Sequence, residues 1–267
     1  MKKKEFTVLM PVYNSFHITS RFESAISSVY TNSIKPKTVI VIANGKLSKK
    51  FRMKLLEIKK KKKFRLYFLQ TANLHEALNY GLKKINTPWV IRADGDDINH
   101  KDRFKILSNY FEKYDLIGSY VDEVDENNKL QRIKKVPIIK KNILKYAKFR
   151  NPFNHMSVAF KSEIIKKVGC YPCIYLKEDY ALWAKLIQSN VKMINLSRRL
   201  VKAYSGSEMI IRRSGYKILV SEIMLQKFLY DTKINSIFMS LVSFTVRFLF
   251  LLAPFQIKKI LYNIIRR

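Results

Sequence analysis

Short apolar runs alternate with helix-like segments through the first part of the chain. The runs are only four or five residues long and most contain β-branched or aromatic residues, which is typical of buried strands; they cover residues 7–10, 38–42, 65–69 and 89–93. Between them, apolar side chains recur at helical spacing in residues 21–30, 49–60 and 74–84. This alternation predicts an α/β fold in which helices cover both faces of a parallel sheet.

The second half of the chain has a less regular pattern. Its predicted elements are a helix at 103–113, a strand at 115–121, a charged turn at 122–128, a polar loop at 151–157 and an amphipathic helix at 181–187. Because ligands of parallel sheets bind at the carboxyl ends of the strands, we expect the loops at 11–14, 43–45 and 94–97 to gather around one crevice.

Three carboxylates follow the fourth predicted strand. Asp94, Asp96 and Asp97 lie within four residues and repel one another unless a cation compensates them. An EF-hand is excluded, because counting from Asp94 places Ile98 at the fifth position and Lys105 at the twelfth. A solvated turn that caps the next helix remains an alternative. The functional interpretation is a site for a divalent cation. Mg²⁺ in particular is bound by few protein carboxylates and completes its coordination with substrate phosphates.

The overall composition indicates a folded protein with an anionic partner. The 267 residues are 48% hydrophobic, and 52 Lys and Arg against 20 Asp and Glu give a net charge of +32. Such a charge suits nucleic acid, an anionic membrane face or phosphorylated substrates, and does not choose among them. The first residues lack the apolar segment of a secretory signal, and Cys170 and Cys173 cannot form a disulfide framework, so we expect a cytoplasmic protein.

Several polar residues in the second half have both a structural and a functional interpretation. His155 is either a structural hydrogen-bonding residue or part of a site. Glu178 and Asp179 either cap a helix or supply a general base. Arg212 and Arg213 either bind a phosphate or are surface charge.

An apolar segment at 237–254 completes the pattern. As a helix it places Ser236, Ser240, Ser243 and Arg247 on one narrow stripe, with large apolar residues over the rest. It is short for a membrane span and contains an arginine, so an amphipathic helix lying at an anionic membrane surface fits better. Lys258, Lys259, Arg266 and Arg267 would assist, and packing on the protein's own domain is the alternative.

Five short motifs then occur in a familiar order. They are Pro-Val-Tyr-Asn at 11–14, Ala-Leu-Asn-x-Gly at 77–81, Arg-Ala-Asp-Gly-Asp-Asp at 92–97, Asn-Pro-Phe-Asn-His at 151–155 and Glu-Asp-Tyr-x-Leu-Trp at 178–183. Together they resemble family 2 glycosyltransferases of the GT-A fold, and in particular the bacterial transferases that build capsules, exopolysaccharides and O-antigens, the amylovoran type among them. The likeness runs from about residue 6 to residue 213.

This resemblance implies a nucleotide-diphosphate sugar donor, Mg²⁺ or Mn²⁺, and inversion at the anomeric carbon. It assigns Asp179 as the base, Asp94, Asp96 and Asp97 to the metal, and the following residues to the nucleotide-sugar: Pro11, Tyr13, Asn14, Asn44, Asn79, Arg92, Asp94, His155, Glu178, Arg212 and Arg213. At Asn44 the family usually carries Asp, so we expect the contact with the nucleotide base to differ from that in the family.

The resulting prediction is a UDP-sugar transferase, of the UDP-galactose type, that acts on a lipid-linked saccharide at the inner face of the cytoplasmic membrane. We expect a catalytic domain at 1–213, with a donor half to about 98 and an acceptor half beyond it, and a membrane-associating helical region at 214–267. No nucleic acid partner is expected. Two alternatives are a degenerate, basic binding protein and a nucleotidyltransferase; the latter would normally show a Gly-rich phosphate loop, which a chain with 7 glycines lacks.

Overall fold

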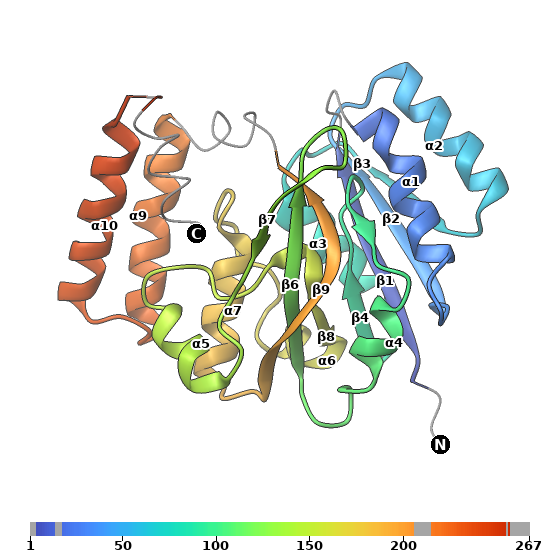
Figure 1. Ribbon diagram of the computed structural model, residues 1–267. Coiled ribbons are helices and arrows are strands. Elements are labelled where there is room, and N and C mark those ends of the chain that lie inside the picture. The colour runs from blue at the N-terminus through green and yellow to red at the C-terminus, as the bar shows by residue number, and fades with distance from the viewer. Residues whose placement is uncertain (1–3, 14–17, 206–214, 255, 257–267) are drawn as a thin grey trace.

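A single mixed sheet lies at the centre of the protein, in a computed structural model that describes residues 4–13, 18–205, 215–254 and 256. The order of its strands is β3-β2-β1-β4-β8-β6-β9-β5, with β7 against β6 (Figure 1). The strands are β1 Phe6–Tyr13, β2 Thr38–Asn44, β3 Arg65–Leu69, β4 Trp89–Arg92, β5 Ile98–Asn99, β6 Leu116–Val124, β7 Leu130–Lys134, β8 Ala159–Lys161 and β9 Met193–Tyr204.

Helices cover both faces of this sheet. They are α1 Ile18–Tyr30, α2 Lys49–Lys61, α3 Leu74–Lys83, α4 Arg103–Ser108, α5 Lys140–Tyr146, α6 Ser162–Lys167, α7 Glu178–Gln188, α9 Tyr216–Asp231 and α10 Ile237–Leu252. Alternate residues of β1 point to opposite faces, as the strand period requires. Val8 and Met10 belong to the core shared with α1, α2 and α4, whereas Leu9 belongs to the core shared with α3, α5, α6 and α7.

The predicted α/β architecture is confirmed, and its sheet is mixed. β3, β2, β1 and β4 are parallel neighbours, as are β6 and β9, while β8 pairs antiparallel with both β4 and β6. The carboxyl ends of β1, β2 and β4 therefore meet at one edge of the sheet.

Two predicted boundaries in the second half were wrong. The helix expected to reach residue 113 ends at Ser108, and the strand expected to end at residue 121 continues to Val124. Asp122 and Glu123, which suggested a turn, lie within the strand because cationic partners compensate them: Arg199 lies 3.5 Å from Asp122, and Arg132 pairs with Glu123. Ion pairs between strands thus overrode the polar pattern.

The C-terminal helices pack beside α7 at one end of the molecule (Figure 1). Leu225 and Leu229 of α9 form a small core with Tyr180 and Ala184 of α7. Helix α10 packs on α9 with its polar stripe inward, so that Ser240 and Ser243 are its buried residues. Its large apolar side chains point outward, and seven of them are at least 40% exposed: Ile237, Phe238, Leu241, Val242, Val246, Leu249 and Leu252.

Within the described residues, every helix is too short or too polar to cross a lipid bilayer.

Gly81 provides a test of how α3 packs on the sheet. A Cβ atom at this position would lie 2.3 Å from Cδ1 of Leu9 on β1, which is too close for any real contact. We expect Gly81→Val to lower the free energy of unfolding by about 1–3 kcal/mol, through overpacking. In a denaturant titration, Leu9→Ala should make room, so the double variant should lose less stability than the two single losses combined. Simple additivity would contradict this packing.

Candidate active site

The donor-side residues predicted from the first two strands lie together at their carboxyl ends. Tyr13 is opposite Asn44 in the register of β1 and β2. Two residues earlier on each strand, Pro11 is opposite Ile42. Tyr13 is 40% exposed, whereas Asn44 is buried. The Oδ1 atom of Asn44 accepts no hydrogen bond from any described residue, which leaves a buried acceptor at this edge of the sheet.

The carboxylates that follow β4 differ in their surroundings. Asp94 is half-buried and its Oδ1 accepts a hydrogen bond from Arg92 Nη2 at 2.6 Å. Asp97 is buried and accepts from the backbone N–H of Tyr204 at 3.2 Å. Burial, followed by repulsion from Asp96 and Asp94, raises the pKa of Asp97 well above its ordinary value. The cluster therefore has a strong affinity for positive charge.

A fully buried arginine holds the backbone around this cluster. Arg103 donates to the carbonyl of Arg92 at 2.7 Å and to the carbonyl of Met156 at 2.9 Å, and also bonds Asn99. Burial lowers its pKa to about 9, although the charge of Asp97 opposes that effect. Arg103 thus joins the end of β4 to the loop that contains His155.

The second acidic pair lies at the first turn of α7. Asp179 Oδ2 accepts a hydrogen bond from Asn151 Nδ2 at 2.6 Å, and its Oδ1 accepts from the N–H of Tyr180 at 2.8 Å. Glu178 is buried, and its Oε2 has no hydrogen-bond partner in the described part of the chain. Burial, followed by repulsion from Asp179, raises the pKa of Glu178 to about 7.

A buried tyrosine, Tyr171, hydrogen-bonds His155 and is affected by the charges of both acidic groups. Burial raises the pKa of Tyr171; Arg92 opposes this, and Asp179, Glu178 and Asp94 add to it, so the charges of β4 and α7 act on one hydroxyl. His155 Nε2 lies 3.0 Å from that hydroxyl. Burial, followed by the charge of Arg92, lowers the pKa of His155 well below its ordinary value, so its imidazole is neutral at pH 7.

The other predicted residues have different surroundings. The side-chain amide of Asn79 is used by the backbone of Tyr171, since it donates to the carbonyl and accepts from the N–H, both at 2.9 Å. Asn14, Arg212 and Arg213 lie outside the described residues. No three His, Cys, Asp or Glu side chains form a ready-made metal site in the described ranges.

Sequence reasoning missed three residues that shape this region. Asn151 was part of a quoted motif, so a signal for it existed. Tyr171 and Arg103 carried none, because an isolated tyrosine or arginine gives no indication that its polar group will be buried.

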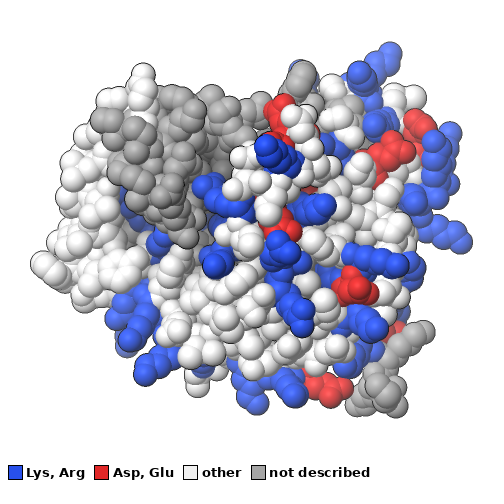
Figure 2. Space-filling view, in the orientation of Figure 1, with Lys and Arg blue, Asp and Glu red and all other residues white. Residues whose placement is uncertain are grey.

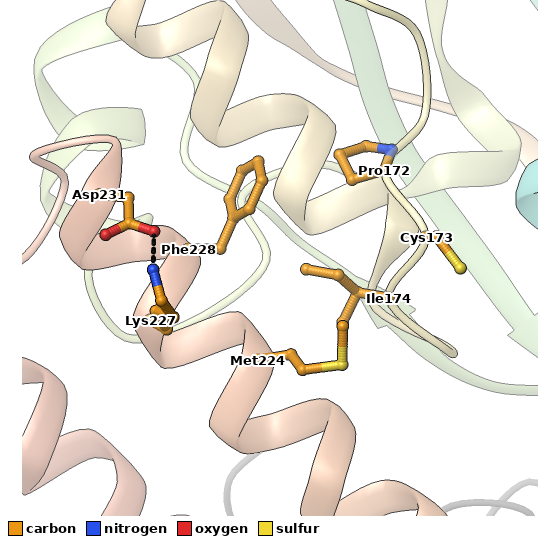
Figure 3. Close-up of a pocket in the computed structure, with 7 residues that line it drawn as sticks. All are labelled: Pro172, Cys173, Ile174, Met224, Lys227, Phe228 and Asp231. Atoms are coloured by element: carbon orange, nitrogen blue, oxygen red, sulfur yellow. Dashed lines mark hydrogen bonds and ion pairs between the residues drawn. The ribbon is translucent and has the colours of Figure 1, made fainter.

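The clearest cavity in the described structure lies away from these carboxylates. It has a volume of about 290 Å³ and lies between the loop at 172–174 and helix α9 (Figure 3). Its lining residues are Pro172, Cys173, Ile174, Met224, Lys227, Phe228 and Asp231. None of them is a predicted site residue, so the site is defined by its chemistry and not by this cavity.

Solved structures with a similar fold identify the fold class. A crystal structure of S. aureus TarS 1-349 superposes with a TM-score of 0.64 over 90% of this chain and 70% of that chain, at 15% identity. A second TarS 1-349 structure, in complex with UDP-GlcNAc, has a TM-score of 0.62 at 15% identity and covers 85% of this chain and 66% of that one. The protein has the GT-A fold of glycosyltransferases.

Sequence comparison identifies the family. Residues 7–169 match Glycosyl transferase family 2, and the chain belongs to this family of enzymes. It is 34% identical to the UDP-Gal:alpha-D-GlcNAc-diphosphoundecaprenol beta-1,3-galactosyltransferase of Escherichia coli, over 98% of this chain and 97% of the relative. It is 28% identical to the amylovoran biosynthesis glycosyltransferase AmsE of Erwinia amylovora, over 97% and 98%. The predicted family is confirmed.

Glu178 makes stability depend on pH. The pKa of Glu178 is about 7 in the folded protein and about 4.5 in the unfolded chain. Between these pH values the folded protein keeps a proton that the unfolded chain has lost, so the free energy of unfolding falls as pH rises from 4.5 to 7. Glu178→Gln is neutral throughout, so its stability relative to wild type should rise across this window, by at most about 3 kcal/mol. Denaturant titrations at several pH values measure the difference. Exposed Glu163→Gln is the control, and parallel curves for wild type and Glu178→Gln would contradict the assignment.

Proposed function

We propose that this protein is an inverting transferase that moves a sugar, of the galactose type, from a UDP-sugar to a hydroxyl of a lipid-linked saccharide in surface polysaccharide biosynthesis. The observation that carries the proposal is the presence of two acidic groups held by hydrogen bonds: Asp94 by Arg92 at the end of β4, and Asp179 by Asn151 at the start of α7, each at 2.6 Å. A direct displacement needs both groups. One would hold the cation that stabilises the leaving diphosphate, and the other would accept the proton of the attacking hydroxyl. The full-length similarity to the E. coli galactosyltransferase supports the donor and the acceptor class.

The nucleoside would bind at the carboxyl ends of β1 and β2. Pro11 and Tyr13 would line its pocket, and Asn44 would face the base. The buried Oδ1 of Asn44 lacks a partner among the described residues and suits a base N–H, such as N3–H of uracil. An amide can therefore replace the Asp that relatives usually carry here.

The residues at the end of β4 fit a divalent cation. Burial, followed by repulsion from Asp96 and Asp94, raises the pKa of Asp97, and a bound cation would relieve the repulsion. Because Mg²⁺ needs only one or two protein carboxylates when substrate phosphates complete its coordination, one or two of Asp94, Asp96 and Asp97 would suffice, and the three need not converge on one point. When bound, the metal supplies charge stabilisation for the leaving diphosphate. Arg92, next to Asp94, would add to it.

Asp179 would act as the base. The hydrogen bond from Asn151 favours the charged form of this carboxylate and fixes its direction. It would accept the proton of the acceptor hydroxyl as that oxygen attacks the anomeric carbon from the side opposite the diphosphate. One displacement of this kind inverts the configuration.

Two substitutions separate the binding role from the base role. We expect Asp96→Ala to abolish metal-dependent binding of the UDP-sugar. Asp179→Asn should keep donor affinity within about two-fold and lower kcat by about 10²–10⁴. Calorimetry and a transfer assay with a lipid-diphosphate GlcNAc acceptor measure the two quantities. Asp231→Asn, on the surface of α9, is the matched control. Wild-type turnover by Asp179→Asn would refute the base assignment.

The C-terminal helices would dock on the inner leaflet of the cytoplasmic membrane. Helix α10 turns its apolar side chains outward. In Figure 2 this end of the molecule presents mostly uncharged atoms, whereas Lys and Arg are spread over the sheet domain beside it. An apolar face next to a strongly cationic body suits an anionic lipid surface, where the acceptor lipid also resides.

Charges on the outer face of α10 should release the protein from lipid. We expect Leu241→Glu/Leu249→Glu to lose binding to phosphatidylglycerol-containing vesicles, because both side chains are about 60% exposed and their replacement should cost the fold little stability. Leu130→Glu, an equally simple change at a side chain that is 47% exposed on β7, should keep binding. Cosedimentation measures this, and wild-type binding by the double Glu variant would exclude α10 as the docking surface.

A further inference from the structure

The single charged residue of α10 points into the protein. Arg247 Nη1 lies 3.0 Å from the carboxylate of Glu222 on α9, and Arg247 Nη2 donates to the carbonyl of Phe149 at 2.6 Å. Glu222 is buried, so its charge needs a partner that is held in place. Arg247 therefore connects α10 both to α9 and to the loop that precedes the Asn-Pro-Phe-Asn-His motif.

Glu222 extends this connection to the start of α7. Lys177 Nζ lies 3.0 Å from Glu222, and Lys177 is the residue immediately before Glu178 and Asp179. Burial alone would raise the pKa of Glu222, but the charges of Lys177 and Arg247 lower it below its ordinary value. The carboxylate is therefore ionised and binds both cations.

The loop that Arg247 contacts is held at three consecutive carbonyl groups. Tyr180 donates its hydroxyl to Ala147 at 2.7 Å, Asn235 donates its side-chain amide to Lys148 at 3.0 Å, and Arg247 bonds Phe149. Asn235 lies in the connection between α9 and α10. Two of these three donors thus come from the C-terminal helical pair.

Asn151, two residues further along, contacts the proposed base. Its Nδ2 donates to Asp179 at 2.6 Å, while its Oδ1 accepts from the N–H of Phe153 at 3.3 Å and so orients the amide. The segment that bears Asp179 is held from both sides: through Lys177 by Glu222, and through Asn151 by the loop that Arg247 anchors.

We propose that Arg247 is a positioning residue for sugar transfer, which keeps Asp179 in place through Glu222 and Lys177 on one side and through Phe149 and Asn151 on the other. This inference rests on the proposed role of Asp179 as the base. It explains why a helix whose outer face is apolar carries an arginine on its inner stripe. The C-terminal helices, which we propose to face lipid, would then also help to hold the reaction centre in place.

The expected effect falls on turnover and not on donor binding. Displacement of a catalytic group by about 1 Å can cost about 10²-fold in rate. We expect Arg247→Met to lower kcat by about 10–100-fold, while the Kd for the UDP-sugar stays within about two-fold, because the residues at β1, β2 and β4 are not in the network. Arg247→Lys keeps a cation for Glu222 and should restore part of the loss.

Two comparisons distinguish positioning from a general loss of structure. Asn151→Ala should lower kcat by a similar factor, and Arg247→Met/Asn151→Ala should lose less than the product of the two single losses, since one of the two routes from Arg247 to Asp179 runs through the Asn151 hydrogen bond. Lys227→Met removes an exposed cation of α9 that pairs with Asp231 at 2.6 Å and should leave kcat unchanged. If Arg247→Met does not fold, Asn235→Ala removes one uncharged contact to the same loop and should lower kcat several-fold at unchanged donor affinity.

The outcomes separate this inference from the proposed function. An inactive Asp179→Asn together with a folded, fully active Arg247→Met would overturn the role of Arg247 alone. Additive losses for Arg247→Met and Asn151→Ala, or a parallel loss of donor affinity, would also overturn it. Turnover by Asp179→Asn at the wild-type rate would instead refute the base on which the inference rests.

Discussion

The site depends on how the protein keeps a dense group of like charges in place. Three carboxylates follow β4 within four residues, and the most buried of them, Asp97, is destabilised in its ionised form by burial and by its neighbours. Arg92 and Arg103, both almost fully buried, lie against this group. A buried guanidinium is costly unless it is hydrogen-bonded, and Arg103 meets that condition with backbone carbonyls from two segments. Arg103 therefore both compensates negative charge and joins the two chain segments.

The same principle operates at the other end of the site. Glu222 is buried between Lys177 and Arg247, and its two ion pairs join the C-terminal helices to the first turn of α7. The backbone of Tyr171 is held by Asn79, and its hydroxyl lies next to a neutral His155. Many of these polar contacts thus hold distant chain segments around the proposed reaction centre.

Sequence reasoning identified the first half of the fold well, because four short strands and three amphipathic helices obey simple periodicities. It located the strand β3 at 65–69 and began α2 and α3 at the observed residues. It failed at Asp122 and Glu123, where ion pairs formed by the tertiary structure keep charged residues in a strand. Local pattern carries no information about such partners.

For the site, the sequence motifs identified the acidic residues, and the resemblance to the glycosyltransferase family assigned their roles. The supporting residues were harder to find, because their importance comes from burial. Arg103 and Tyr171 are unremarkable in the sequence and become central only when their polar atoms are enclosed. The inward stripe of α10 was visible as a pattern, but its partner Glu222 was not, since pairing between helices depends on packing.

The claim that these segments form one metal-dependent donor site is tested most directly by calorimetric titration of the full chain with UDP-galactose and other UDP- and GDP-sugars, first with Mn²⁺ and then with EDTA. The account predicts binding of a UDP-sugar in Mn²⁺ that disappears in EDTA. Silence across the panel from protein shown to be folded, or equal affinity in EDTA, would contradict it.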